Sequence, residues 1–100
     1  MNTASPADIL RQRLALVAKV SALTAEALKL RQMLAGAQMD VLRCELEIGR
    51  TGSGGRLVRD LHEAEASAAA VEAAIAECEQ RIATVEREVA DLDGALAAAR

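Results

Sequence analysis

The chain has 100 residues, of which 52% are hydrophobic, 27% are charged and none is aromatic. Many aliphatic and charged residues without aromatic ones are typical of long helices and coiled coils, whereas a mixed globular core normally buries large aromatic side chains. The formal net charge of −3 and the lack of aromatic residues argue against a nucleic-acid partner. A protein that binds nucleic acid contacts the phosphates with Lys and Arg side chains and stacks aromatic side chains on the bases.

A first helix is predicted from Pro6 to Ile48. Ser5 suits the cap position, Pro6 the first helical position, and Asp8 places a carboxylate near the positive end of the helix dipole. No proline follows, and apolar residues recur at alternating spacings of three and four, which is a heptad seam. The seam consists of Ile9, Leu16, Val20, Leu23, Ala27, Leu30, Leu34, Ala37, Val41, Cys44 and Ile48, with Arg13 as its one misfit.

The stretch GRTGSGGR, residues 49–56, contains four of the six glycines. A phosphate-binding P-loop would require Lys followed by Ser or Thr, and a strand before the glycines, and this stretch has neither. Because glycine adopts the backbone angles that turns require, we expect residues 49–55 to be a bend, with Gly49 at the left-handed end of the first helix. Arg50, Arg56 and Arg59 would then form a basic tip suited to an acidic or anionic partner.

A second helix is predicted over residues 56–99, again with a heptad seam. Its seam consists of Leu57, Leu61, Ala64, Ala68, Val71, Ile75, Cys78, Ile82, Val85, Val89, Leu92, Leu96 and Ala99. When the bend brings Ile48 opposite Leu57, every seam residue of one helix meets a seam residue of the other. The predicted fold is therefore all-α, an antiparallel two-helix coiled-coil hairpin in a single domain of residues 1–100.

The first helix carries a second apolar stripe outside its seam. It consists of Leu10, Leu14, Leu28, Met33, Met39, Leu42 and Leu46. The outer surface of the second helix has mainly alanine instead, at positions 66, 69, 70, 73 and 76. One neighbour cannot bury both stripes of a helix, so we expect the hairpin to join a four-helix bundle or a larger helical assembly, most simply as a homodimer.

The sequence offers no catalytic, cofactor or metal site. Cys44 and Cys78 are expected at buried seam positions, where a thiol acts as a small hydrophobe. At a rise of 1.5 Å per residue they would lie about 26 Å apart along the hairpin, which is too far for a disulfide. His62, between acidic neighbours, lacks the converging ligands of a zinc site. With no nucleophile beside a base, we expect neither an enzyme nor a small-molecule substrate. The lack of a long apolar run or a signal-peptide pattern predicts a cytoplasmic protein without a membrane partner.

We therefore expect a non-enzymatic coiled-coil protein or scaffold that binds a protein partner or a second copy of itself. The predicted partner-binding residues are Leu28, Met39, Leu42 and Leu46 of the second stripe, with Arg50, Arg56 and Arg59 at the bend. In architecture the chain resembles the helical-hairpin stalk proteins of flagellar and type III export machines. This resemblance implies a stalk or chaperone-like component of a bacterial secretion apparatus.

Two further resemblances concern length and shape. The chain is similar to the small secreted helical hairpins of the type VII system, although residues 52–54 are Gly-Ser-Gly and lack the Trp of the Trp-x-Gly bend in that family. It also resembles the plasmid RNA-binding hairpin that dimerises into a four-helix bundle. These resemblances imply, as alternatives, an exported protein or a nucleic-acid-binding dimer.

Overall fold

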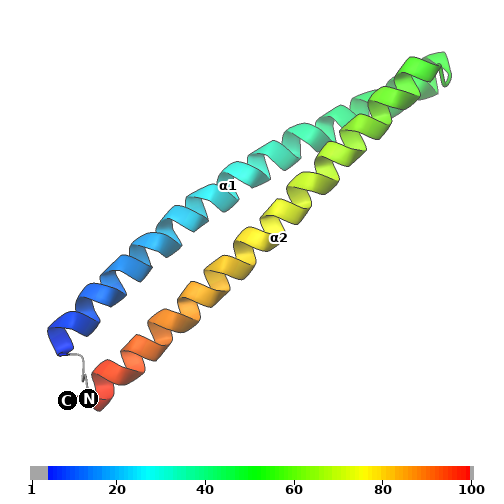
Figure 1. Cartoon of the computed structure of the whole chain (residues 1–100). Helices are drawn as coiled ribbons and strands as arrows, with labels where there is room; N and C mark the ends of the chain where they lie inside the picture. Colours follow the sequence, from blue (N-terminus) through cyan, green and yellow to red (C-terminus); the bar gives the residue numbers. More distant parts are fainter. Residues whose placement is uncertain (1–4, 100) are drawn as a thin grey trace. The chain divides into compact units, whose positions relative to one another are not determined.

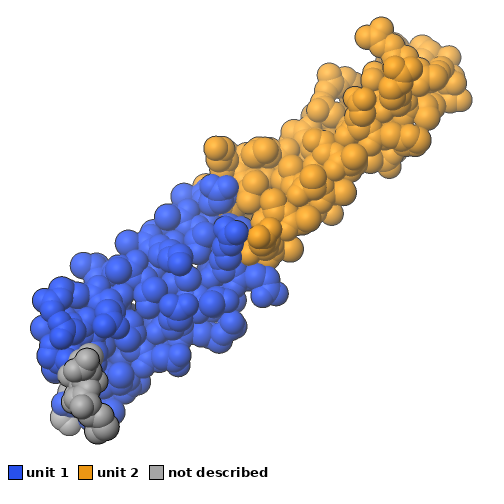
Figure 2. Space-filling model, in the orientation of Figure 1, with its two compact units in different colours: residues 1–26, 78–100 blue, residues 27–77 orange. Residues whose placement is uncertain are grey.

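The computed structural model describes residues 5–99, which form two long helices and no strand. The first helix, α1, spans Pro6–Thr51, and the second, α2, spans Gly55–Ala98 (Figure 1). The fold is an all-α helical hairpin, as predicted. It divides into two compact units, an end unit of residues 1–26 and 78–100 and a turn unit of residues 27–77 (Figure 2). Each unit contains antiparallel segments of both helices.

The start of α1 has the predicted cap. The backbone N–H of Asp8 donates to Ser5 Oγ at 3.2 Å, and the N–H of Ile9 donates to the Ser5 carbonyl at 3.0 Å. The Asp8 carboxylate also accepts a hydrogen bond from Arg11. The bond to Ser5 Oγ satisfies a backbone donor, the N–H of Asp8, that the first turn of a helix leaves without an intrahelical partner.

The turn is shorter than predicted, and the prediction that Gly49 ends the first helix is wrong. α1 continues through Gly49 to Thr51. Gly52 is the residue that adopts the left-handed conformation, with a φ of 88°. Its N–H donates to the Ile48 carbonyl at 2.8 Å and closes the last helical turn. The predicted bend of seven residues therefore contracts to Gly52, Ser53 and Gly54, because a positive φ is what stops the helix.

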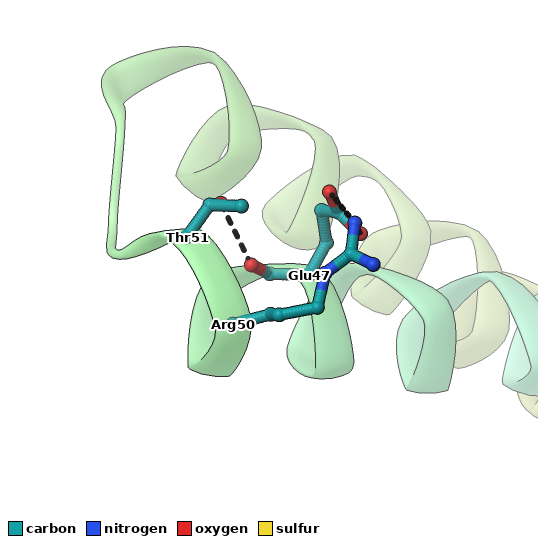
Figure 3. A network of polar contacts seen from close by, with 3 residues as sticks. All are labelled: Glu47, Arg50 and Thr51. Carbon is teal, nitrogen blue, oxygen red and sulfur yellow. Dashed lines mark hydrogen bonds and ion pairs between the residues drawn. The ribbon is translucent and has the colours of Figure 1, made fainter.

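Side chains support the added helical turn (Figure 3). The Arg50 guanidinium donates to both carboxylate oxygens of Glu47, at 2.9 and 3.1 Å, and Thr51 Oγ1 donates to the Glu47 carbonyl at 2.8 Å. Arg50 also places a positive charge at the negative end of the helix dipole. These contacts explain why the helix continues past Gly49.

In the turn unit, the predicted seam residues are the least exposed ones. Ala27, Ala37, Ala68 and Ile75 are buried. The remaining seam residues of this unit are half-buried: Leu30, Leu34, Val41, Cys44, Ile48, Leu57, Leu61, Ala64 and Val71. Removing a large aliphatic side chain from water contributes about 1.5–3 kcal/mol, so this seam is the main source of stability in the unit.

In the end unit, Ile9, Cys78 and Val85 are buried. The Cys78 thiol, from α2, donates to the Leu23 carbonyl of α1 at 3.2 Å. Arg13, the predicted misfit of the first seam, is half-buried, and its Nε donates to the Asp93 carboxylate at 2.6 Å. A charged residue is thus tolerated at this seam position because its head group reaches a carboxylate on the opposite helix.

Candidate functional site

Large hydrophobic side chains are exposed on one helix of the hairpin. Among the described residues, those that the structure leaves exposed are Leu10, Leu14, Val17, Leu28, Met33, Met39, Leu42 and Leu46. All of them belong to α1, so α2 exposes none of comparable size within the described range. The sequence-based prediction that α1 carries additional apolar surface beyond the seam is confirmed for these positions except Val17, which the prediction did not include.

In the turn unit, Leu28, Met39, Leu42 and Leu46 form a row that we call the outer stripe. Their exposed fractions are 58, 65, 54 and 73%. At 100° per residue the four side chains lie within roughly 60° of one another and about 150° from the seam. The outer stripe therefore faces away from α2 within this unit.

Three residues of the predicted second stripe do not belong to this row. Met33 is 50% exposed, but it projects roughly 145° from the centre of the outer stripe. Leu10 and Leu14 lie in the end unit, where they and Val17 form a separate exposed patch. The sequence analysis thus grouped Met33 with residues that project from a different side of α1, and it grouped Leu10 and Leu14 with residues of the other compact unit.

The outer stripe has basic flanks. Lys29 and Arg43 lie along one side of the row, and Arg31 and Glu45 lie along the other side. Each of these four positions is one or three residues from a member of the row, which places it next to the row on the helix surface. Arg43 donates to the Asp40 carboxylate within α1. The side chain of Lys29 makes no ion pair among the described residues.

The corresponding face of α2 is small and acidic. In the turn unit its outward row consists of Ala66, Ala69, Ala73 and Ala76, which we call the alanine face. All four residues are exposed. Acidic side chains flank the face: Glu63, Glu65, Glu72 and Glu77.

The predicted basic tip is only partly available. Arg50 is bound to Glu47 within α1, so its charge is offset by a carboxylate on the same helix (Figure 3). Arg56 and Arg59 are exposed in the first two turns of α2 and make no ion pair with the described residues. The pairing of Arg50 with Glu47 follows the three-residue spacing of neighbours on a helix, and the sequence analysis missed it.

The two cysteines differ in exposure. Cys78 is buried, as predicted, whereas Cys44 is half-buried. Cys44 lines a shallow open groove together with the carboxylates of Asp40, Glu47 and Asp60. Two of these carboxylates are already bound by Arg43 and Arg50.

Comparison with known protein families, with curated protein sequences and with solved structures finds no match to the chain. Among the described residues, no group of three or more His, Cys, Asp or Glu side chains is arranged to hold a metal ion. None of the helices in residues 5–99 is both long and apolar enough to cross a membrane. Function is therefore inferred from the outer faces of the two helices.

Proposed function

We propose that the chain is a non-enzymatic, helical protein-binding or scaffold protein, and that the outer stripe of α1 is its binding surface. The observation that carries this proposal is the row of four large apolar side chains, each more than half exposed, on the side of α1 opposite the seam. Single exposed leucines are common on protein surfaces, but four large apolar side chains on one face of one helix are not.

The spacing of the outer stripe favours a helical partner. Its members are separated by eleven, three and four residues, and Gln32 and Ala35 occupy the intervening positions of the same heptad pattern. Such a row fits between the side chains of a second helix. Burial of each Leu or Met contributes about 1.5–3 kcal/mol, so four of them suffice to offset a substantial part of the cost of association.

The proposed partner is a helix of another protein or of a second copy of this chain, and the proposed location is the cytoplasm. Arg56 and Arg59 at the turn are a secondary contact in this proposal, suited to an acidic segment of the partner. The outer stripe contributes the binding free energy, because exposed charged pairs add only about 0–1 kcal/mol each.

The test replaces Leu28, Leu42 and Leu46 together with Glu. The seam does not contain these residues, so helix content measured by circular dichroism should persist. Sedimentation should show that assemblies of the wild-type chain fall to the monomer mass of 10.5 kDa, or co-purification should show that a bound partner is lost. A triple variant with wild-type mass and wild-type partners would contradict the proposal.

Met33 provides a matched control for a single substitution. Leu42 and Met33 lie on the same helix and have similar exposed fractions, 54 and 50%. Leu42→Glu should weaken association, and Met33→Glu should not, because Met33 lies outside the outer stripe. Equal effects of the two variants would point to general surface hydrophobicity rather than to this row.

A further inference from the structure

We propose that the outer stripe of α1 binds the alanine face of α2 in a second copy of the chain, so that copies associate head to tail. This inference rests on the proposed function and specifies the partner. Within the turn unit, the outer stripe and the alanine face lie on opposite sides of the hairpin, since each is directed away from the seam.

The two faces complement each other in size. α1 presents long Leu and Met side chains, whereas α2 presents alanines at the same heptad spacing. With α1 antiparallel to α2 of the second copy, Met39 packs against Ala69 of the second copy and Leu42 against Ala66 of the second copy. The alanine face thus covers the middle of the outer stripe, and its two ends, Leu28 and Leu46, lie opposite Gln80 and His62 of the second copy. Large side chains packed on alanine let two helices approach closely without leaving cavities.

The charges of the two helices are also complementary. α1 contains seven basic and five acidic residues, whereas α2 contains four basic and ten acidic residues. In the register above, Lys29 lies beside Glu77 of the second copy and Arg43 beside Glu63 of the second copy, although Arg43 also binds Asp40 within α1 and Glu77 has a partner within its own chain. Such complementarity selects partner and register more than it adds affinity.

Packing α1 against α1 of a second copy lacks the surplus of acidic residues that α2 offers to the basic flanks of the outer stripe. The antiparallel register that pairs Leu28 with Leu46 of the second copy would place Lys29 beside Arg43 of the second copy on one flank and Arg31 beside Glu45 of the second copy on the other. Like charges that face each other across an interface oppose association. The acidic flanks of the alanine face relieve this repulsion.

Gly36 supplies an independent observation. It lies in the middle of α1, is exposed, and a Cβ added there would meet no atom within 4 Å. Glycine at such a position makes the helix less stable than alanine would, and packing within the hairpin gives no reason for it. In the proposed register Gly36 lies beside Ala70 of the second copy, where the missing side chain allows close backbone approach.

One pair in this register is unfavourable, because Glu45 lies beside Glu65 of the second copy. Arg50 also approaches Arg56 of the second copy, but Glu47 already binds Arg50 and offsets its charge. The Glu45 contact provides a sharp test, since Glu45→Lys should strengthen association by roughly two- to fivefold, the range of an exposed ion pair.

The proposed interface joins different surfaces of the two copies, so it is heterologous. Each copy in a pair retains one unused outer stripe and one unused alanine face. Copies therefore continue to add until a ring closes or a filament grows, and a closed dimer is not the end point. This outcome differs from the homodimer expected from the sequence.

The principal experiment mixes two variants that are each blocked on one face. In one, Leu28, Met39 and Leu42 are replaced with Glu, and in the other, Ala66, Ala69 and Ala73 are replaced with Glu. Sedimentation of wild-type chain should show species larger than a dimer, and each variant alone should be monomeric. Their equimolar mixture should form a heterodimer of about twice 10.5 kDa, because one intact stripe meets one intact alanine face.

Other outcomes separate this inference from the proposed function. Two outcomes would overturn the head-to-tail inference and leave the proposed function standing. In the first, the alanine-face variant assembles like the wild-type chain. In the second, the wild-type chain is monomeric, and the stripe variant alone fails to bind a different protein that the wild-type chain binds. If the stripe variant keeps both its assembly and its partners, both are overturned. Circular dichroism shows that each variant is folded, with Ser67→Glu as a control for an added acid on α2 outside the alanine face.

Charge exchange tests the same interface if the alanine-face variant does not fold. Lys29→Glu with Arg43→Glu should weaken self-association roughly tenfold, and so should Glu63→Lys with Glu77→Lys. A mixture of the two double variants should recover association, because the exchanged charges again oppose one another. Mixtures that remain as weak as the separate variants would overturn the register.

Discussion

α1 and α2 are alike on the side that faces the hairpin seam and different on the side that faces away. Both have a heptad seam whose described members are buried or half-buried up to Leu96. The exposed large hydrophobic side chains belong to α1, whereas the outward row of α2 in the turn unit is alanine. α2 therefore shows that a helix of this hairpin forms without large outward side chains. We propose that the outer stripe of α1 serves an interaction beyond the hairpin.

Breaking the shared inward side should have the largest effect. Val85→Asp places a charge at a position that is 3% exposed, and we expect it to lower the free energy of unfolding by at least about 3 kcal/mol, because no partner compensates the buried carboxylate. Urea unfolding followed by circular dichroism at a fixed protein concentration measures this loss.

The matched substitution on the outward side of the same helix is Ala90→Asp. Ala90 is exposed, so the expected loss is only about 0.5–1 kcal/mol, mainly because Asp has a lower helix propensity than Ala. If Val85→Asp and Ala90→Asp lowered the free energy of unfolding equally, the placement of Val85 on the inward side and of Ala90 on the outward side would be contradicted.

Two glycine substitutions should produce smaller effects of opposite sign. Gly52→Ala should destabilise the hairpin by about 1–2 kcal/mol, because Gly52 has a φ of 88° and an L-residue pays for that conformation. Gly36→Ala should stabilise the isolated hairpin by about 0.5–1 kcal/mol, since a methyl group there meets open space. Thermal unfolding measures both, and a stabilising Gly52→Ala would remove the explanation given for the end of α1.

The smallest effect concerns thiol reactivity and leaves stability unchanged. Cys78 on α2 is buried and donates to the Leu23 carbonyl, whereas Cys44 on α1 is half-buried beside an open groove. A thiol reagent should therefore label Cys44 faster than Cys78 under native conditions, because Cys78 requires local opening. Mass spectrometry of digested protein measures the two rates, and faster labelling of Cys78 would contradict its seam position.

The sequence predicts the seam and the start of α1 well, because both depend on local signals. The heptad period alone places Ile75 and Val85 on the side that faces the seam. Ser5 is three residues before Asp8, near enough for its Oγ to accept a hydrogen bond from the N–H of Asp8. The end of α1 is harder to predict, because Gly49 and Gly52 are chemically identical and only the backbone angle distinguishes them.

The sequence predicted that α1 carries apolar residues outside its seam, but it did not predict which of them share one face. Hydrophobicity identified Met33 and Leu42 equally, and their angular positions on α1 separate them. Arg13 and Asp93 are 80 positions apart in sequence, and their contact depends on how the two helices are aligned. The apolar pattern of a single helix contains no information about that alignment. Exposure of Leu42 likewise depends on where the partner helix lies.

The three-residue turn has a further consequence for how the chain finds its fold. The seam residues Ile48 and Leu57, on either side of Gly52–Gly54, are nine positions apart, whereas Arg13 and Asp93 are 80 apart. Bringing the latter pair together first would cost about 2 kcal/mol more loop-closure entropy than starting at the turn. The hairpin is therefore expected to close as a zipper from the glycines outward, and each layer of seam residues shortens the loop that the next layer must close.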